Sequence, residues 1–304
     1  MADLSTRVGS LELACAVLTA SGTAGVGDEL AGYGALDSLG AVVVKSLAAF
    51  AWPGNPAPRL TTWGPSMLNA VGLSGPGVAA WRADGLVRLR RRGATVVASI
   101  WGRTAAEFEA AAAGLAGAEI AAVEVNASCP NLEGRRGIFA HSPEATAAVV
   151  AAAAAAGVPR WAKLSPNTPE LLAVAEAALA AGAEALVLVN TVLGLAIDVE
   201  ARRPTLAHGG GGLSGRAIAP IALRAVYECR AAFPEAAIVG VGGIATGEDA
   251  VAMAMAGADA IEVGTATFAD PRAPFGVRAQ LERWLDDHGV GAFAEIVGAA
   301  HGDA

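Results

Sequence analysis

The chain has 304 residues, of which 54% are hydrophobic and 16% are charged, and its formal net charge at pH 7 is −8. This negative charge disfavours nucleic acid as the main partner. The N-terminal stretch has no basic region followed by an apolar core, and no apolar run reaches the length of a membrane span. We therefore expect a cytoplasmic protein that does not contact a membrane.

Short β-rich runs alternate with alanine-rich helical stretches along the chain. We expect strands over residues 12–21, 41–46, 95–101, 121–127, 160–165, 185–191, 237–243 and 260–266. This alternation predicts a parallel α/β fold, and eight units within roughly 260 residues fit a (β/α)8 TIM barrel better than a doubly wound sheet. No break in composition divides the chain, so we expect a single domain over residues 1–304.

The expected strands begin with apolar residues and end on polar residues or glycine. The ends are Ser21, Lys45-Ser46, Ser99, Asn126, Lys163, Asn190-Thr191, Gly242-Gly243 and Gly264-Thr265. In a (β/α)8 barrel these ends meet on one face, which is the face that carries active sites. Two lysines and two asparagines on that face predict a functional site rather than simple fraying into polar loops.

Glycine-rich segments follow the last two expected strands. VGVGGI and VGTATF place small residues where backbone N–H groups can approach a phosphate, and the loops after these strands are the usual phosphate site of the fold. A third stretch, HGGGGLSG (208–215), could close over the same region. Together they favour a ligand that bears a phosphate.

The segment VEVNASCPN (123–131) places a cysteine on a loop directly after a strand. The period of two puts Glu124 and Asn126 on one face of that strand, and the two valines face the helices. Cys129 has no apolar run around it, and the following proline fixes the local backbone, which favours a reactive thiol over a packing residue. We interpret Cys15 and Cys229 as packing residues, and three widely spaced cysteines suit neither a disulfide framework nor a zinc site.

Nine segments occur in the same order as in a known family. They are VVKS (43–46), GNPAPR (54–59), MLNAVGL (67–73), NASCPN (126–131), AKLSPN (162–167), VNT (189–191), GGLSG (211–215), GVGGI (240–244) and VGTA (263–266). Together they resemble the class 1 dihydroorotate dehydrogenases, and most of all class 1B, the catalytic subunit of the NAD-linked enzyme. Class 2 is similar but carries a membrane-binding extension and a serine as its base.

The resemblance implies an FMN-dependent oxidation of dihydroorotate to orotate in de novo pyrimidine (UMP) biosynthesis. Cys129 would be the general base that removes a proton from C5, and a hydride would pass from C6 to N5 of FMN. The resemblance also implies a partner subunit with FAD and a [2Fe–2S] cluster that passes electrons to NAD, around a homodimer core or in a heterotetramer. The chain itself has too few cysteines for such a cluster and lacks a GxGxxG motif between a strand and a helix.

The resemblance also assigns roles to positions that match the family's motifs. The expected substrate-binding residues are Lys45, Asn69, Ala70, Val71, Gly72, Leu73, Asn126, Asn190 and Thr191, with Asn131 assisting. The expected cofactor-binding residues are Ser21, Lys45, Ser46, Ser99, Asn126, Lys163, Val189, Gly215, Gly242, Gly243, Gly264 and Thr265, the last four around the phosphate. Lys163 would lie near N1 and O2 of the flavin, where a cation stabilises the reduced ring. No metal site is expected.

Ser99 departs from the family pattern, which commonly has an asparagine there, and serine reaches less far toward a flavin. Three other functions stay open. One is a class 1A-like homodimer that uses fumarate, and another is a related dihydropyrimidine-type flavin oxidoreductase. The third is a barrel that binds a phosphorylated ligand without redox chemistry. Colour separates the last from the others, because a protein that holds FMN is yellow.

Overall fold

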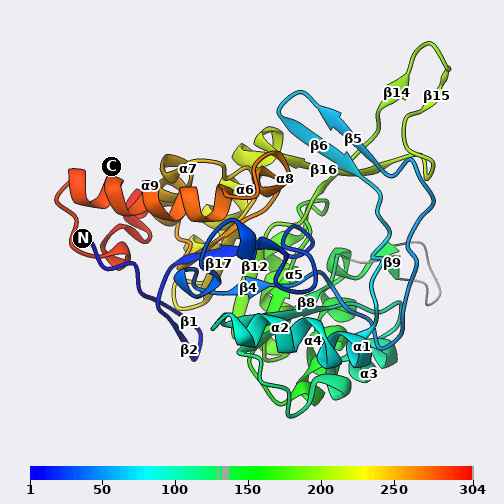
Figure 1. The fold of residues 1–304 in the computed structure, drawn as a ribbon, viewed down its shortest axis with the longest axis horizontal. Coiled ribbons are helices and arrows are strands. Elements are labelled where there is room, and N and C mark those ends of the chain that lie inside the picture. The colour runs from blue at the N-terminus through cyan, green and yellow to red at the C-terminus, as the bar shows by residue number, and fades with distance from the viewer. Residues whose placement is uncertain (129, 132–136, 303–304) are drawn as a thin grey trace.

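The protein is a closed barrel of eight parallel strands (Figure 1). The computed structural model describes residues 1–128, 130–131 and 137–302. The barrel strands are β3 (Val17–Thr19), β4 (Val42–Val43), β7 (Val96–Ile100), β8 (Ala122–Asn126), β11 (Arg160–Lys163), β12 (Ala185–Leu188), β17 (Ala237–Val241) and β18 (Ala260–Val263). They follow one another around the barrel in chain order, and β18 pairs with β3 to close it. The predicted (β/α)8 fold is confirmed.

Helices alternate with these strands. The α-helices are α1 (Val78–Ala83), α2 (Gly85–Arg91), α3 (Ala105–Leu115), α4 (Pro143–Ala152), α5 (Leu171–Ala180), α6 (Ala219–Ala232), α7 (Gly247–Met255), α8 (Ala266–Ala269) and α9 (Ala273–Asp287). The 3-10 helices are η1 (Glu29–Gly32), η2 (Leu36–Ser38), η3 (Phe139–His141), η4 (Ala153–Ala156), η5 (Arg216–Ile218), η6 (Phe293–Ile296) and η7 (Ala299–His301). Alanine favours these helices, and hydroxyl caps start several of them. Thr246, for example, forms a capping box with Asp249 at the start of α7.

Two separate apolar cores result from the alternation of side chains along the strands. Val123 and Val125 belong to the large core between the barrel and its helices, as predicted. Ala122 and Trp161 belong to the smaller core inside the barrel. Because side chains with a period of two share a face, Glu124 must lie on the interior side together with Ala122. The two unassigned cysteines, Cys15 and Cys229, are both buried and unpaired, as expected for packing residues.

The strand expected over residues 12–21 is wrong in its first half. Strand β2 (Leu11–Leu13) instead pairs antiparallel with β1 (Thr6–Val8), and the chain enters the barrel only at β3. The hairpin brings Val8 and Leu13 into the core inside the barrel. These apolar residues therefore cover one end of the barrel interior rather than extend its first strand.

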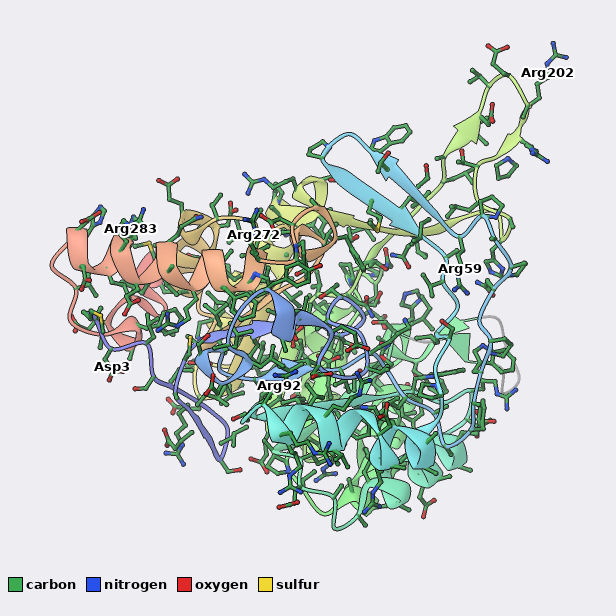
Figure 2. All side chains as sticks on the ribbon, viewed as in Figure 1. Asp3, Arg59, Arg92, Arg202, Arg272 and Arg283 are labelled. Carbon is green, nitrogen blue, oxygen red and sulfur yellow. The ribbon has the colours of Figure 1, made fainter. Side chains whose placement is uncertain are left out.

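A second, antiparallel sheet was not predicted. It contains β5 (Leu60–Trp63), β6 (Ser66–Asn69), β13 (Val192–Gly194) and β16 (Gly211–Gly215) in the order β13-β16-β6-β5. Two short pairs complete the strands, β9 (Pro130–Asn131) with β10 (Gly137–Ile138), and β14 (Ile197–Asp198) with β15 (Arg203–Pro204). The β14–β15 arm projects from the body in Figure 1, and Figure 2 labels Arg202 at its tip.

Among the residues that the structure describes, no helix combines the length and the apolar character that a membrane span requires. In the same part of the chain, no three histidine, cysteine or acidic side chains are grouped so that they could hold a metal ion.

Candidate active site

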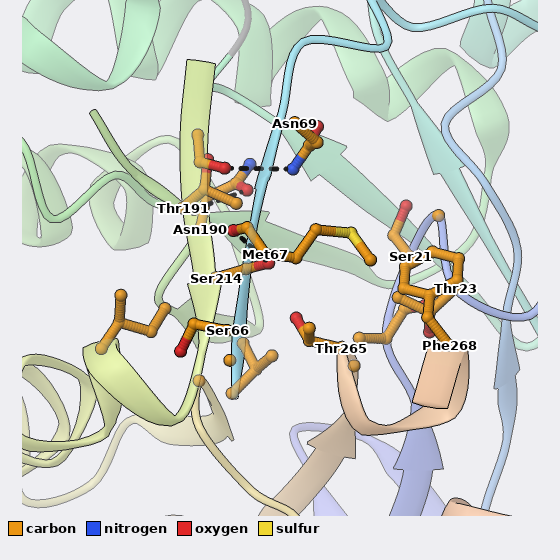
Figure 3. Close-up of a pocket in the computed structure, with 18 of the residues that line it drawn as sticks. Ser21, Thr23, Ser66, Met67, Asn69, Asn190, Thr191, Ser214, Thr265 and Phe268 are labelled. Atoms are coloured by element: carbon orange, nitrogen blue, oxygen red, sulfur yellow. Dashed lines mark hydrogen bonds between the residues drawn. The ribbon is translucent and has the colours of Figure 1, made fainter. Parts of the chain in front are cut away.

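A cavity of about 1370 Å³ opens between the carboxyl ends of the barrel strands and the antiparallel sheet. Figure 3 shows part of it, with Asn69 and Thr191 toward one end and Ser66 and Thr265 toward the other. Single-ligand pockets measure about 300–1,000 Å³, so this cavity has room for a large cofactor together with a small substrate. It lies on the face where the polar strand ends were expected to meet.

The structure brings nearly all predicted site residues to this cavity. Those that line it are Ser21, Lys45, Ser46, Asn69, Ala70, Val71, Gly72, Leu73, Asn126, Lys163, Val189, Asn190, Thr191, Gly215, Gly242, Gly243, Gly264 and Thr265. Cys129 lies outside the described residues, although its neighbour Ser128 lines the cavity. The side chain of Asn131 is likewise outside the described part of the structure.

Ser99 is the exception among the predicted residues that the structure describes. Its side chain is wholly buried and does not line the cavity. The Ser99 hydroxyl is instead 2.9 Å from the hydroxyl of Ser46, which does line it. Ser46 therefore lies between the Ser99 side chain and the cavity, and any effect of Ser99 on a ligand would pass through Ser46.

Amide side chains at the ends of β8 and β12 are already ordered by hydrogen bonds. Asn190 donates from Nδ2 to Oδ1 of Asn126 over 3.2 Å, and Asn126 donates from Nδ2 to the hydroxyl of Ser46 over 3.1 Å. The backbone N–H of Thr191 donates to Oδ1 of Asn190 over 2.8 Å. A chain of this kind fixes which side chain groups face the cavity as donors and acceptors.

Asn167 was quoted in a motif but was given no role from the sequence. Its Nδ2 donates to the backbone oxygen of Thr191 over 2.9 Å, and its Oδ1 accepts from the N–H of Leu193 over 2.8 Å. These bonds tie the loop after β11 to the segment that leads into β13. Asn167 therefore positions Thr191 although it does not line the cavity itself.

The segment 69–73 is held from two sides. Asn55 donates from Nδ2 to the oxygen of Ala70 over 2.9 Å, and Asn69 donates from Nδ2 to the oxygen of Gly212 over 3.2 Å. Leu73 has a positive φ of 59°, which is costly for a residue with a side chain. Its side chain packs on an aromatic cluster that includes Trp101, and this contact offsets the cost.

Glycines at the other end of the cavity are required by close packing. A Cβ atom at Gly243 would come within 2.4 Å of the Cβ of Ala219, and one at Gly215 would lie 3.1 Å from the Cα of Ser66. At Gly242 and Gly243, φ is 134° and 79°, which side chains rarely allow. The predicted phosphate-binding segment thus has the bare, tightly folded backbone that such a site needs.

Three charged side chains meet inside the barrel, directly under the cavity. Lys163 Nζ lies 2.8 Å from Oε2 of Glu262 and 3.5 Å from Oε2 of Glu124. The lysine side chain is 6% exposed and both glutamates are completely buried. Burial lowers the pKa of Lys163, but the negative charges of Glu124 and Glu262 raise it more, so the ammonium stays charged.

The same environment also raises the pKa of Glu262, but the individual causes act in opposite directions to those at Lys163. Burial raises its pKa, the nearby Lys163 lowers it, and Glu124 raises it again, with a net value of about 8. Neither glutamate was assigned a role from the sequence. The available signal was a glutamate flanked by apolar residues in each of two buried strands, AVEVN and AIEV, because an unpaired buried carboxylate is costly.

Lysine usage gives a second signal for the site. Of the 21 lysine and arginine residues in the chain, only Lys45 and Lys163 are lysines, and both line the cavity. The other members of this set are all arginines. A compact ammonium with three donors is therefore kept only at these two positions of the site.

Comparisons with known proteins agree with this geometry. A sequence profile of the family "Dihydroorotate dehydrogenase" matches residues 3–285. The chain is 42% identical over 297 residues to the "Dihydroorotate dehydrogenase B (NAD(+)), catalytic subunit" of Alkaliphilus oremlandii, covering 97% of this chain and 98% of that protein. It is 46% identical over 296 residues to the protein of the same name from Desulforudis audaxviator, covering 97% and 96%.

A solved structure shares the fold. The dihydroorotate dehydrogenase of Eimeria tenella, determined in complex with ferulenol, superposes with a TM-score of 0.81 at 21% identity, covering 99% of this chain and 89% of that one. At this identity the likeness concerns the fold alone. The family assignment rests on the profile and on the curated relatives. The chain belongs to the dihydroorotate dehydrogenase family.

Proposed function

We propose that this chain is the catalytic subunit of an NAD-linked dihydroorotate dehydrogenase, which oxidises dihydroorotate to orotate with FMN as the first electron acceptor. The observation that carries the proposal is the cavity itself, which combines a buried lysine, ordered amides and a bare glycine segment. The curated relatives that match nearly the whole chain are named as catalytic subunits of dihydroorotate dehydrogenase B (NAD(+)).

The residues of the cavity fit FMN. Gly242, Gly243, Gly264 and Thr265 would hold the phosphate, since their backbone N–H groups are not shielded by large side chains. Ser21, Ser46 and Lys163 would lie along the ring. When bound, FMN supplies a two-electron acceptor for the hydride. Lys163, held in its charged form by two glutamates, would stabilise negative charge at the edge of the ring.

The amide groups suit a small cyclic imide such as dihydroorotate. Asn126, Asn190 and Asn69 can each present a donor and an acceptor, which matches the alternating carbonyl and N–H edge of a pyrimidine. The carboxylate of the substrate would lie near Lys45 and the segment 69–73. Hydrogen bonds that are ordered before binding reduce the entropy cost of orienting the substrate.

Cys129 is the proposed general base. Removal of a proton from a carbon next to a carbonyl needs a base held at a fixed position, and a thiol works only as its thiolate. Ser128, which precedes Cys129 in the sequence, lines the cavity, and this supports the proposal. We also propose that a partner subunit with FAD and a [2Fe–2S] cluster takes the electrons to NAD, because the sequence of this chain has only three cysteines, fewer than a cluster needs.

Anaerobic mixing of the purified, FMN-loaded chain with dihydroorotate tests the proposal. The yellow absorbance of the flavin should bleach. Fumarate and NAD should then be added in turn, the latter with and without the partner subunit, and recovery of colour only with NAD and the partner is expected. A protein that binds no FMN, or that keeps its colour with dihydroorotate, would contradict the proposal. Recovery with fumarate alone would favour a class 1A-like enzyme.

A further inference from the structure

We propose that Glu124 and Glu262 form a carboxyl pair that holds one proton and fixes the position and charge of Lys163 beneath the cavity. The inference rests on the proposed function, because it concerns the lysine assigned to the flavin ring. The two glutamates are positioning residues, since they act on a ligand through Lys163. We call these two side chains the carboxyl pair.

The barrel topology brings the pair together. Strand β18 is the fourth strand from β8 in either direction around the barrel, so Glu124 and Glu262 extend from opposite walls toward the barrel axis. Lys163 comes from β11, next to β8, and its Nζ contacts an oxygen of each carboxyl at 3.5 and 2.8 Å. All three side chains meet directly below the cavity, which Glu124 and Lys163 both line.

Charge balance requires a proton on the carboxyl pair. With every group ionised, two carboxylates and one ammonium would leave a net negative charge in a site that is almost completely closed to solvent. Burial of an uncompensated charge is unfavourable, and one proton on the pair makes the cluster neutral. Two carboxyls that share a site and cannot both ionise are a known source of a raised pKa.

Carboxyl oxygens of the pair that have no hydrogen-bond partner can hold this proton. Both side-chain oxygens of Glu124 and Oε1 of Glu262 are buried without a hydrogen-bond partner in the described part of the chain. Burial raises the pKa of Glu262, and the nearby Glu124 raises it further. A carboxylic acid on one residue would therefore donate to a carboxylate on the other.

The residues in register with the pair on the four neighbouring strands are uncharged. Leu18 on β3 and Val241 on β17 lie in register with Glu262, and Ser99 on β7 and Trp161 on β11 lie in register with Glu124. The core inside the barrel is apolar. Lys163 is the charged partner of the pair, and Lys45 is the other ammonium that lines the cavity.

The small number of lysines makes a direct test possible without any cofactor. Protein labelled with isotopes at lysine Cε and Nζ gives only two side-chain NMR signals, and the variant Lys45→Arg assigns them. The Lys163 signal of the wild-type chain should shift through one step near pH 8 as the pair loses its proton. The variants Glu262→Gln and Glu124→Gln should each lose this step, because the remaining carboxyl has no second carboxyl with which to share a proton. The exposed control Glu176→Gln should keep it.

A wild-type Lys163 signal without a step between pH 6 and 10 would overturn the proposal. A step that survives in both single variants would also overturn it, and the two variants cover the case in which one does not fold. This measurement needs no flavin. Its failure would therefore leave the proposed activity standing, whereas absence of bleaching by dihydroorotate would refute the activity and not the carboxyl pair.

The loaded protein gives a second measurement. Reduction of the flavin would add negative charge beside Lys163, and this charge favours the protonated form of the pair. Above pH 8, where the pair has lost its proton, the pair would therefore take up one proton from solvent for every two electrons. The midpoint potential should then fall about 30 mV more steeply per pH unit, the two-electron equivalent of a tenfold change in proton concentration. Both glutamine variants should lose this extra slope, and a slope that stays unchanged in them would contradict the proposal.

Discussion

Asn190 and Asn126 stand at the ends of two strands that are separated by β11, and their side-chain amides are joined by a hydrogen bond of 3.2 Å. Asn126 in turn donates to Ser46, so three strand ends share one network at the cavity. Such a network orders donors and acceptors before a ligand arrives. Amide groups that would otherwise rotate are therefore fixed toward the substrate position.

The variant Asn190→Ala should weaken substrate binding. It removes a proposed contact to the pyrimidine, leaves Oδ1 of Asn126 without its partner, and frees the N–H of Thr191. Loss of such hydrogen bonds costs about 1–3 kcal/mol, so KM for dihydroorotate should rise about 10- to 100-fold. Steady-state kinetics measure this change, and the visible absorbance should show unchanged FMN content. An unaltered KM would exclude Asn190 from substrate binding.

The variant Gly212→Ala should disturb the site from the opposite wall. A Cβ at this position would come within 2.1 Å of Oγ1 of Thr191, so the threonine must move. We expect KM for dihydroorotate to rise about tenfold or more, because small displacements of positioning groups have large kinetic effects. Gly32→Ala is the matched control, since a Cβ there meets nothing within 4 Å. Equal kinetics of the two variants would refute the role of Gly212.

Much of the barrel could be predicted because its strands are short, apolar and regularly spaced. The alternation along residues 123–126 correctly separated the helix-facing valines from the interior side chains. The antiparallel sheet over the cavity was missed because its strands are glycine-rich or exposed, so the hydrophobic pattern is weak there. That sheet forms only when distant segments pair, as β16 does with β6.

In the site, too, residues within local motifs could be predicted, whereas contacts between distant strands could not. Residues within family motifs came to the cavity as expected, because several motifs follow barrel strands that end on the same face. The motifs MLNAVGL and GGLSG instead lie on the antiparallel sheet over the cavity. Lys163 was among them, but its two acidic partners were not. Their significance depends on opposite strands meeting at the barrel axis, which one strand's sequence does not specify.

Alkylation should distinguish the three cysteines. Burial raises the pKa of the Cys15 thiol and raises that of Cys229 to about 12, so neither forms a thiolate at neutral pH. Because the thiolate is the reactive form, iodoacetamide should modify Cys129 first, and orotate should slow the reaction. Peptide mass spectrometry measures both effects. Modification of Cys15 or Cys229 at the same rate in the folded protein would argue against a special thiol at position 129.

The variant Cys129→Ser should retain FMN and reduce it slowly. Serine is a far weaker acid than cysteine, so in a site built around a thiol it should remove the proton from C5 much more slowly near pH 7. Stopped-flow bleaching with dihydroorotate measures the rate, and we expect a loss of about 100-fold or more, in line with the usual contribution of a general base. Cys15→Ser is the control, because it changes a buried thiol away from the cavity. Wild-type bleaching in Cys129→Ser would rule out the base.

The carboxyl pair should also set how stability depends on pH. The pKa of Glu262 is about 8 in the folded protein and near 4.5 in the unfolded chain, so the folded state binds more protons between these values. Its contribution to stability is therefore full below pH 4.5 and is lost as pH rises through 8, with about 1.4 kcal/mol for each unit of pKa difference. Glutamine cannot titrate, so Glu262→Gln should gain stability relative to the wild type as pH rises from 5 to 8. Urea unfolding at several pH values measures the difference, and a difference that does not change with pH would show that Glu262 is ionised throughout that range.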